Sequence, residues 1–144
     1  PESFNFPRPM INKKNIDFSF SGLKTAVYYE FKKIKEIDDS KKADLAASFQ
    51  AAVAETLLIK TREAMESTDL EELVIGGGVA SNKYIRTKLI EGMKDKNIFF
   101  PPISRCTDNG AMIAYAGSFY MQDIQKNLDL NIRPRWPLSE LANG

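Results

Sequence analysis

Three consecutive glycines, Gly76 to Gly78, separate a short apolar segment from a helical pattern, and this arrangement limits the fold more than any other part of the sequence. Residues Glu72–Ile75 predict a buried strand, and apolar side chains recur at helical spacing after the turn. A strand that leads directly into a helix is typical of α/β proteins. Glycines let backbone approach a ligand closely, and N–H groups at a helix start attract anions or nucleotides. We therefore favour a ligand-binding turn over a tight turn without a ligand.

The glycine turn matches neither common nucleotide-binding loop. It lacks the Lys and Ser/Thr that follow the last glycine of a Walker loop, and its glycines are not spaced as G-x-G-x-x-G. Asn82 follows the turn and has two interpretations of equal weight. Its side chain could satisfy the free amides of the first helical turn, or it could bind a donor and an acceptor on a ribose or base.

The remaining hydrophobic pattern predicts an α/β fold with a small, mixed, partly parallel sheet. The expected elements are a half-buried strand at Ile16–Phe20, helices at Leu23–Lys35 and Lys41–Glu66, a strand at Glu72–Ile75, a helix at Asn82–Lys94, a strand at Asn97–Phe100 and a helix ending near Asp123. We expect a single α/β lobe over residues 1–144. In it, residues 1–15 form an extended N-terminal segment and residues 127–144 form an irregular tail.

Capping residues mark the expected helix starts. The run Asp38-Asp39-Ser40 precedes the longest helix, where acidic side chains also interact favourably with the helix dipole. Ser81 is expected to cap the helix after the glycine turn, and Thr107 or Asp108 the last helix. Small side chains in the longest helix predict close packing against another element, at Ala46, Ala47, Ala51 and Ala52.

The composition excludes several kinds of active site. The 144 residues include no histidine and one cysteine, so the sequence has no Ser-His-Asp triad, no Cys-His pair and no H-E-x-x-H zinc site. One cysteine forms no internal disulfide, which fits a reducing compartment. The net charge of +1 excludes a strongly basic arm, and the sequence has neither a membrane-length apolar run nor a signal-peptide pattern. We expect a cytoplasmic protein with no membrane partner.

A second polar cluster, Cys106–Ala111, follows the strand at Asn97–Phe100 and a pair of prolines. If the two strands are parallel, this cluster and the glycine turn leave the same edge of the sheet, where α/β proteins bind ligands. Considered by itself, Asp108 is most simply a helix cap, because one carboxylate does not hold a divalent metal ion. Cys106 is expected to be a small buried residue and not a nucleophile.

Other polar residues give weaker signals. Lys24 follows a Ser-Gly turn and could contact phosphate, although a solvated lysine in the first helical turn is the more common case. Four further residues could bind RNA by charge or stacking, namely Arg105, Arg133, Arg135 and Trp136. For each of them, a solvent-exposed position without a ligand is the more common case.

Three segments, in the same order, resemble one protein family. Phe18–Val27 resembles a family signature, and Gly76–Asn82 with the following Ile85-Arg86 resembles its glycine motif. Pro101-Pro102 with Cys106–Ala114 resembles its C-terminal metal motif. The family is that of the tRNA N6-adenosine threonylcarbamoyltransferases (TsaD), and the resemblance is to its C-terminal part. It covers nearly the whole chain, and three motifs in register are highly specific.

The resemblance implies a fold and a reaction. The fold is the C-terminal lobe of an actin/Hsp70/sugar-kinase-like (ASKHA) fold, without its N-terminal lobe. The reaction transfers a threonylcarbamoyl group from threonylcarbamoyl-adenylate to N6 of adenosine 37 of tRNA (t6A formation). The implied partners are tRNA, this adenylate and other subunits of the t6A-forming complex. Gly76, Gly77, Gly78 and Asn82 would bind the adenylate or nucleotide and position the leaving AMP, whereas Asn109 and Ser21 receive no role.

The resemblance also implies one divalent metal ion, iron or zinc, per full-length subunit. Asp108 would be one ligand, and a His-x-x-x-His pair from the N-terminal part would complete the site. This sequence contains no histidine, so we expect the isolated chain to bind metal poorly and to be inactive. In the family the ion would act as a Lewis acid and as a template.

Two other functions are open from sequence. An ATP-binding lobe of a sugar-kinase or Hsp70-like protein would use the glycine turn for ATP and a carboxylate for Mg²⁺, but the Cys-Thr-Asp-Asn-Gly motif disfavours it. A non-catalytic scaffold subunit of a tRNA-modifying complex would bind nucleotide without transferring a group. Asp108 is evidence against the scaffold, which has no need of a metal ligand there.

Overall fold

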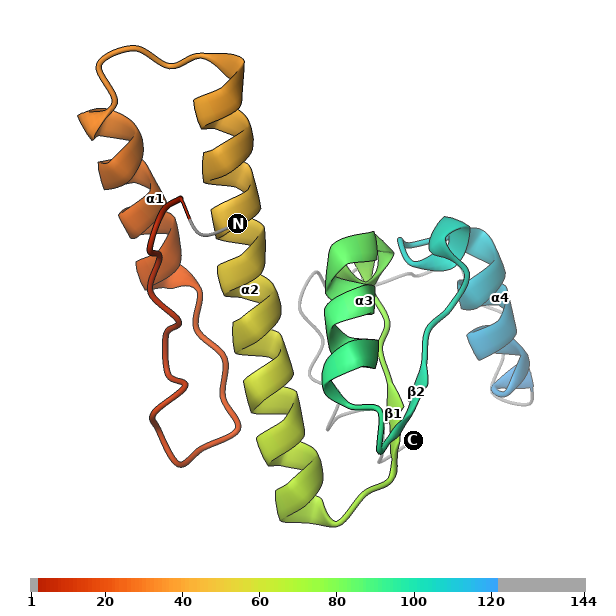
Figure 1. The fold of residues 1–144 in the computed structure, drawn as a ribbon. Helices are drawn as coiled ribbons and strands as arrows, with labels where there is room; N and C mark the ends of the chain where they lie inside the picture. Colours follow the sequence, from red (N-terminus) through yellow and green to blue (C-terminus); the bar gives the residue numbers. More distant parts are fainter. Residues whose placement is uncertain (1–2, 122–144) are drawn as a thin grey trace. The chain divides into compact units, whose positions relative to one another are not determined.

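The computed structural model describes residues 3–121, and the chain divides into two compact units, Pro1–Asp108 and Asn109–Gly144. The first unit contains α1 (Ser21–Lys33), α2 (Asp39–Thr68), β1 (Glu72–Val74), the 3₁₀ turn η1 (Gly78–Ser81), α3 (Lys83–Gly92), β2 (Asn97–Phe99) and the 3₁₀ turn η2 (Ile103–Arg105) (Figure 1). The second unit contains α4 (Gly110–Ser118). The expected α/β character is confirmed, and the single lobe over residues 1–144 stays a prediction.

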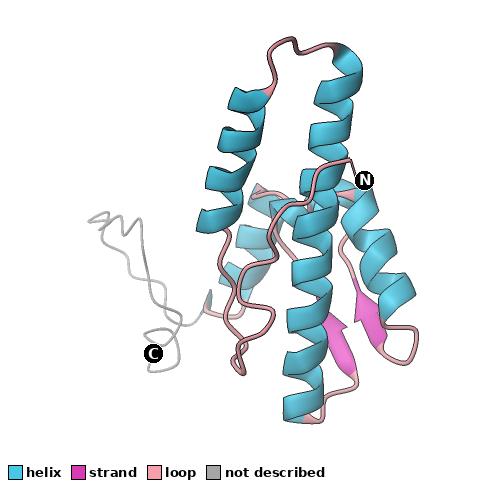
Figure 2. Cartoon of the chain, turned by 60° about the vertical axis from the view of Figure 1, so that its left-hand side comes forward, coloured by secondary structure: helices cyan, strands magenta, loops and turns pink. Residues whose placement is uncertain are grey.

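Among the described residues, β1 and β2 form a two-stranded parallel sheet (Figure 2). Leu73 pairs with Ile98, and the hydrogen bond from Ile75 N to Phe99 O (3.0 Å) extends the ladder past β1. Parallel neighbours need a crossover connection, and α3 provides it. Both strands therefore end at the same edge of the sheet, as the sequence predicts for the glycine turn and the second polar cluster.

Helix α2 is the common support for the buried side chains of the first unit. Within residues 3–121, one cluster contains Ala54, Met65, Ile85, Leu89 and Met93, and a second contains Phe6, Leu23 and Ala52. Half-buried Val53 packs against both clusters. Close packing of small side chains is confirmed at Ala51 and Ala52, which are buried, but not at Ala46, which is exposed.

The ends of α2 follow from local chemistry. The Asp38 carboxylate accepts a hydrogen bond from Lys41 N (2.7 Å), so the predicted start signal is confirmed. At the other end, Asp69 takes a left-handed conformation (φ 53°) and its N–H donates to Met65 O. This arrangement is a common way to end a helix, and it places the end of α2 close to the predicted Glu66.

The predicted strand at Ile16–Phe20 is wrong. These residues form no strand, and Ile16 and Phe18 are exposed. The Phe18 and Phe20 rings stack with centroids 6.5 Å apart, so the alternating pattern does place the aromatic side chains on one side. A strand also needs a hydrogen-bonded neighbour, and no strand within residues 3–121 pairs with this segment.

Ser81 is not the cap of α3, contrary to the prediction. The glycine turn continues into η1, where Ser81 Oγ donates to Gly78 O (2.7 Å). The extra turn moves the helix start by one residue. Asn82 therefore becomes the cap, and its Oδ1 accepts from Ile85 N (3.1 Å).

The cap predicted for the last helix is also wrong. Neither Thr107 nor Asp108 caps α4; Asn109 does, and its Oδ1 accepts from Met112 N (3.0 Å). The turn η2 forms in the stretch before α4 that was expected to be loop. The helix therefore begins later than predicted. Helix α4 ends at Ser118, short of the predicted end near Asp123, a residue that lies outside the described range. Residues 127–144, with Arg133, Arg135 and Trp136, also lie outside it.

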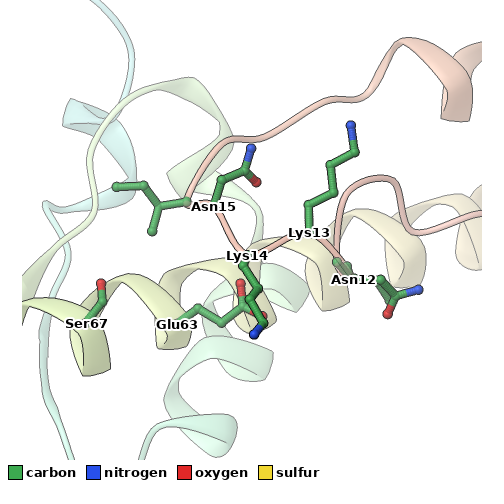
Figure 3. A pocket seen from close by; sticks show the side chains of 8 residues that line it. Asn12, Lys13, Lys14, Asn15, Glu63 and Ser67 are labelled. Atoms are coloured by element: carbon green, nitrogen blue, oxygen red, sulfur yellow. The ribbon is translucent and has the colours of Figure 1, made fainter.

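A loop before α1 is attached to α2 by a buried lysine. Lys60 Nζ donates to Lys13 O (2.7 Å), Asn15 O (2.8 Å) and Glu63 Oε2 (2.7 Å). Loop residues and α2 together line a pocket of about 390 Å³ (Figure 3). Within residues 3–121, no helix has both the length and the apolar character that crossing a membrane requires.

Candidate functional site

The glycine turn leaves β1 in a conformation that needs glycine at one position. Among the glycines in the described part of the chain, Gly77 alone has a positive φ (86°). A Cβ atom at Gly76 would meet nothing within 4 Å, and one at Gly78 would meet Thr107 Cγ2 at 4.0 Å, an ordinary contact. The folded chain therefore has room for alanine at Gly76 and Gly78. This open space lies beside the backbone where a ligand could approach.

Asn82 lies directly after η1, and both ends of its amide group have partners. Its Oδ1 caps α3, and its Nδ2 donates to Gln50 Oε1 (2.9 Å) on α2. The structure therefore shows the capping role that the sequence allowed. A ligand that used the Asn82 amide would have to exchange one of these hydrogen bonds.

A hollow lies between the glycine turn and α2. A pocket of about 530 Å³ has Gly78, Ser81 and Asn82 on one side and Phe49 and Gln50 on the other. A second, more apolar pocket of about 570 Å³ adjoins it through Phe49, Val53 and Val79, and includes Lys24. Ligand pockets in proteins commonly enclose about 300–1,000 Å³, so the space beside the turn is large enough for a nucleotide-sized molecule.

The chain between β2 and α4, residues 101–108, is called the Asp108 segment, and it lies close to the glycine turn. Turns η1 and η2 contact each other, and just after η2 the side chain of Thr107 comes within 4.0 Å of the place where a Cβ atom of residue 78 would lie. Asp108 is exposed, two residues after Cys106. Cys106 is buried, as predicted. The two polar segments singled out in the sequence thus leave neighbouring strand ends and lie close together.

Arg86 connects these two segments, although the sequence pattern gave it no role. From the first turn of α3, its Nε donates to Ala80 O, and its Nη2 donates to Pro101 O (2.6 Å) and Cys106 Sγ (3.1 Å). The guanidinium carbon lies 4.7 Å from the centroid of the Phe100 ring. An arginine in the first turn of the helix that follows the glycine turn was the signal available in sequence.

The described residues do not form a metal site by themselves. Within residues 3–121, no group of three or more His, Cys, Asp or Glu side chains is close enough to hold a metal ion. One carboxylate does not satisfy the coordination of a divalent ion. Asp108 could therefore supply one ligand to a site whose other donors come from elsewhere. Beside the Ser-Gly turn before Lys24, the Oγ atoms of Ser19 and Ser21 lie 3.3 Å apart. Arg105, the other weak candidate within the described residues, is exposed.

One protein-family model matches most of the chain. A family model described as "TsaD: tRNA N6-adenosine threonylcarbamoyltransferase" matches residues 1–115, which is more than half of the chain. The matched residues include the glycine turn, Asn82, Arg86 and Asp108. The match confirms the resemblance that the three sequence motifs indicated. The chain belongs to the TsaD family of tRNA N6-adenosine threonylcarbamoyltransferases.

Proposed function

We propose that this chain is the C-terminal lobe of an enzyme that transfers a threonylcarbamoyl group from threonylcarbamoyl-adenylate to N6 of adenosine 37 of tRNA. One observation carries the proposal: in a chain that matches the TsaD family, the glycine turn and the Asp108 segment lie together at one edge of the β1–β2 sheet. Ligands of open α/β sheets bind at this edge. An ASKHA-type fold, with a second lobe across the cleft, completes the proposal.

The glycine turn, Gly76 to Gly78, binds the adenylate part of the donor. The space beside Gly76 and Gly78 admits a phosphate or ribose close to the backbone, and a pocket of about 530 Å³ extends from the turn to α2. Transfer leaves AMP with an additional negative charge. The N-terminal end of α3 follows the turn after η1, and a helix N-terminus stabilises a nearby anion.

The transfer step forms one bond and breaks another. The adenosine amine forms a bond to the carbonyl carbon of the threonylcarbamoyl group, the bond from this carbon to the AMP phosphate oxygen breaks, and that oxygen keeps the electron pair. The amine loses a proton, which water or the departing AMP phosphate accepts. The residues of this chain bind and orient the donor for attack, and such positioning lowers the entropy cost of reaction. Asn82 contributes by fixing the start of α3 relative to Gln50 on α2.

Asp108 is the contribution of this chain to a divalent metal site, with iron or zinc as the ion. When it is bound, such an ion would act as a Lewis acid. The donors among residues 3–121 are insufficient, and the full sequence contains no histidine. The remaining ligands are histidines outside this chain, so the isolated chain is inactive. The proposed partners are tRNA and other subunits of a t6A-forming complex in the cytoplasm.

Threonine incorporation into tRNA tests the proposal. The assay supplies threonylcarbamoyl-adenylate and compares the 144-residue chain alone with the chain joined to the histidine-bearing part of a family member. We expect no transfer from the chain alone and transfer from the joined protein. Phosphorylation of a sugar, or tRNA-independent ATP hydrolysis, by a joined protein that transfers nothing would favour a kinase-like or Hsp70-like lobe.

Two variants of the joined protein test the site. Asp108→Asn should lower the metal content and reduce transfer at least about tenfold, whereas Asp39→Asn, at another exposed position beside a helix start, should change neither. Gly76→Ala should raise the KM for the adenylate without lowering stability, because the folded chain has room for the methyl group. Full activity and metal content in Asp108→Asn would contradict the proposed role of Asp108.

A further inference from the structure

Arg86 contacts both segments of the proposed site through one planar group. Its Nε donates to Ala80 O in η1, directly after the glycine turn. Its Nη2 donates to Pro101 O (2.6 Å), which lies before η2, and to Cys106 Sγ (3.1 Å), which lies after it. Cys106 is two residues before Asp108. The Phe100 ring packs against the guanidinium, with its centroid 4.7 Å from Cζ. The acceptors are two backbone carbonyls and a sulfur atom, and none of these is an acidic partner.

This geometry fixes the distance between the two segments. The donors of a guanidinium group have a rigid planar arrangement, and hydrogen bonds from a charged donor are stronger than neutral ones. The β1–β2 ladder holds the two strands together only as far as the bond from Ile75 N to Phe99 O (3.0 Å). The glycine turn and the Asp108 segment begin after that point. Arg86 is a rigid connection between them beyond the sheet.

We propose that Arg86 is a positioning residue of the transfer site: it holds the Asp108 segment at a fixed distance from the glycine turn. The proposal rests on the proposed function, because it assigns the adenylate to the turn and a metal ligand to Asp108. Arg86 acts through the carbonyls of Ala80 and Pro101 and the Cys106 sulfur. Loss of this connection lets the carboxylate move relative to the bound donor, and small displacements of reacting groups are costly to catalysis.

The decisive variant is Arg86→Lys in the joined protein described above. Lysine keeps the positive charge and the helix propensity. Its single ammonium nitrogen cannot reproduce the hydrogen bonds that two nitrogens of the planar guanidinium group donate to the two segments. We expect kcat per folded molecule to fall about 10- to 100-fold, with the folded fraction measured by circular dichroism. The KM for the adenylate should change less, because the glycine turn itself is intact.

The matched control is Leu89→Ala, which lies on the same helix and is buried in the core. It lowers stability without touching the connection, so kcat per folded molecule should stay close to that of the wild type. The labelling rate of Cys106 by a thiol reagent, mapped by mass spectrometry, is a second measurement. Arg86→Lys should increase this rate about tenfold or more. The charge-assisted hydrogen bond to Cys106 Sγ is lost, so the segment around Cys106 opens more often and exposes the thiol to the reagent.

The outcomes separate the two proposals. If the wild type transfers the group while Arg86→Lys keeps its kcat per folded molecule, or Leu89→Ala loses as much, Arg86 is not a positioning residue and the proposed function stands. If the wild type transfers nothing, the proposed function fails, and the positioning role in transfer fails with it. Cys106 labelling then tests the connection alone, and an unchanged rate in Arg86→Lys would show that Arg86 does not hold the two segments together.

Discussion

Replacing Lys60 by methionine should release the loop before α1. The Lys60 side chain is fully buried, and its ammonium group donates to Lys13 O (2.7 Å), Asn15 O (2.8 Å) and Glu63 Oε2 (2.7 Å). Methionine keeps an unbranched apolar stem of similar length but has no donor. The substitution therefore removes the hydrogen bonds with little change in packing.

The magnitude follows from the three partners. Each hydrogen bond from a charged donor contributes about 1.5–3 kcal/mol. The side chain of Glu63 is 40% exposed, so the loss of this ion pair costs less than about 1 kcal/mol. When the loop opens, water forms hydrogen bonds with the carbonyl oxygens of Lys13 and Asn15. These bonds offset part of the free energy lost with the ammonium group. We therefore expect the free energy of unfolding to fall by about 2–4 kcal/mol.

Urea unfolding followed by far-UV circular dichroism measures this loss. The control is Lys42→Met, the same substitution on the same helix at an exposed ion pair with Asp39 (3.0 Å), which should cost less than about 0.5 kcal/mol. Trypsin should also cut faster after Lys13 and Lys14 in Lys60→Met than in the control. Equal stabilities for the two variants, with equal cleavage rates, would falsify the role of Lys60 in holding the loop.

Two further predictions concern α3 and the sheet. Leu89→Ala should lower the free energy of unfolding by about 2–5 kcal/mol because the side chain is buried in the core, while Ile90→Ala at the neighbouring exposed position should lower it by less than about 1 kcal/mol in the same urea experiment. Similar losses at both positions would contradict the packing described for α3. The hydrogen bond from Lys96 Nζ to Glu71 Oε1 (2.7 Å) raises the pKa of Lys96 above its ordinary 10.5, so the interaction stabilises the fold fully below pH 10.5 and is lost as pH rises through the folded-state pKa. The difference in thermal stability between the wild type and Lys96→Met should shrink above that pH, and a constant difference would contradict this linkage.

Elements with local signals were predictable from the sequence. Helix α2 has a strong start signal at Asp38 and a long apolar stripe, and the strands at Glu72–Val74 and Asn97–Phe99 are short apolar runs next to glycine or proline. The segment Ile16–Phe20 has an equally clear alternating pattern but no strand partner, and alternation carries no information about pairing. The caps lie at Asn82 and Asn109, after the predicted Ser81 and the predicted Thr107 or Asp108, because 3₁₀ turns precede both helices and shift their first residues. For Asn82, capping was one of the two interpretations that the sequence left open.

The site was predictable in its motifs but not in its connections. The glycines after one strand and the acidic residue after the other can be recognised in the sequence. Parallel pairing of the two strands then brings both motifs to the same edge of the sheet. The partners of Arg86 lie 6, 15 and 20 positions away. Backbone carbonyls, which are two of its three acceptors, occur at every residue, so no residue type identifies them. Such contacts are determined by the tertiary fold.

Helix α2 makes the loss of structure in the first unit cooperative. Its 30 residues span about 45 Å, and Val53 near the middle packs against both apolar clusters. When either cluster opens, the helix loses a wall on which the other depends. We therefore expect the two clusters to melt in one transition, and the amides around Val53 to exchange with solvent only through global unfolding.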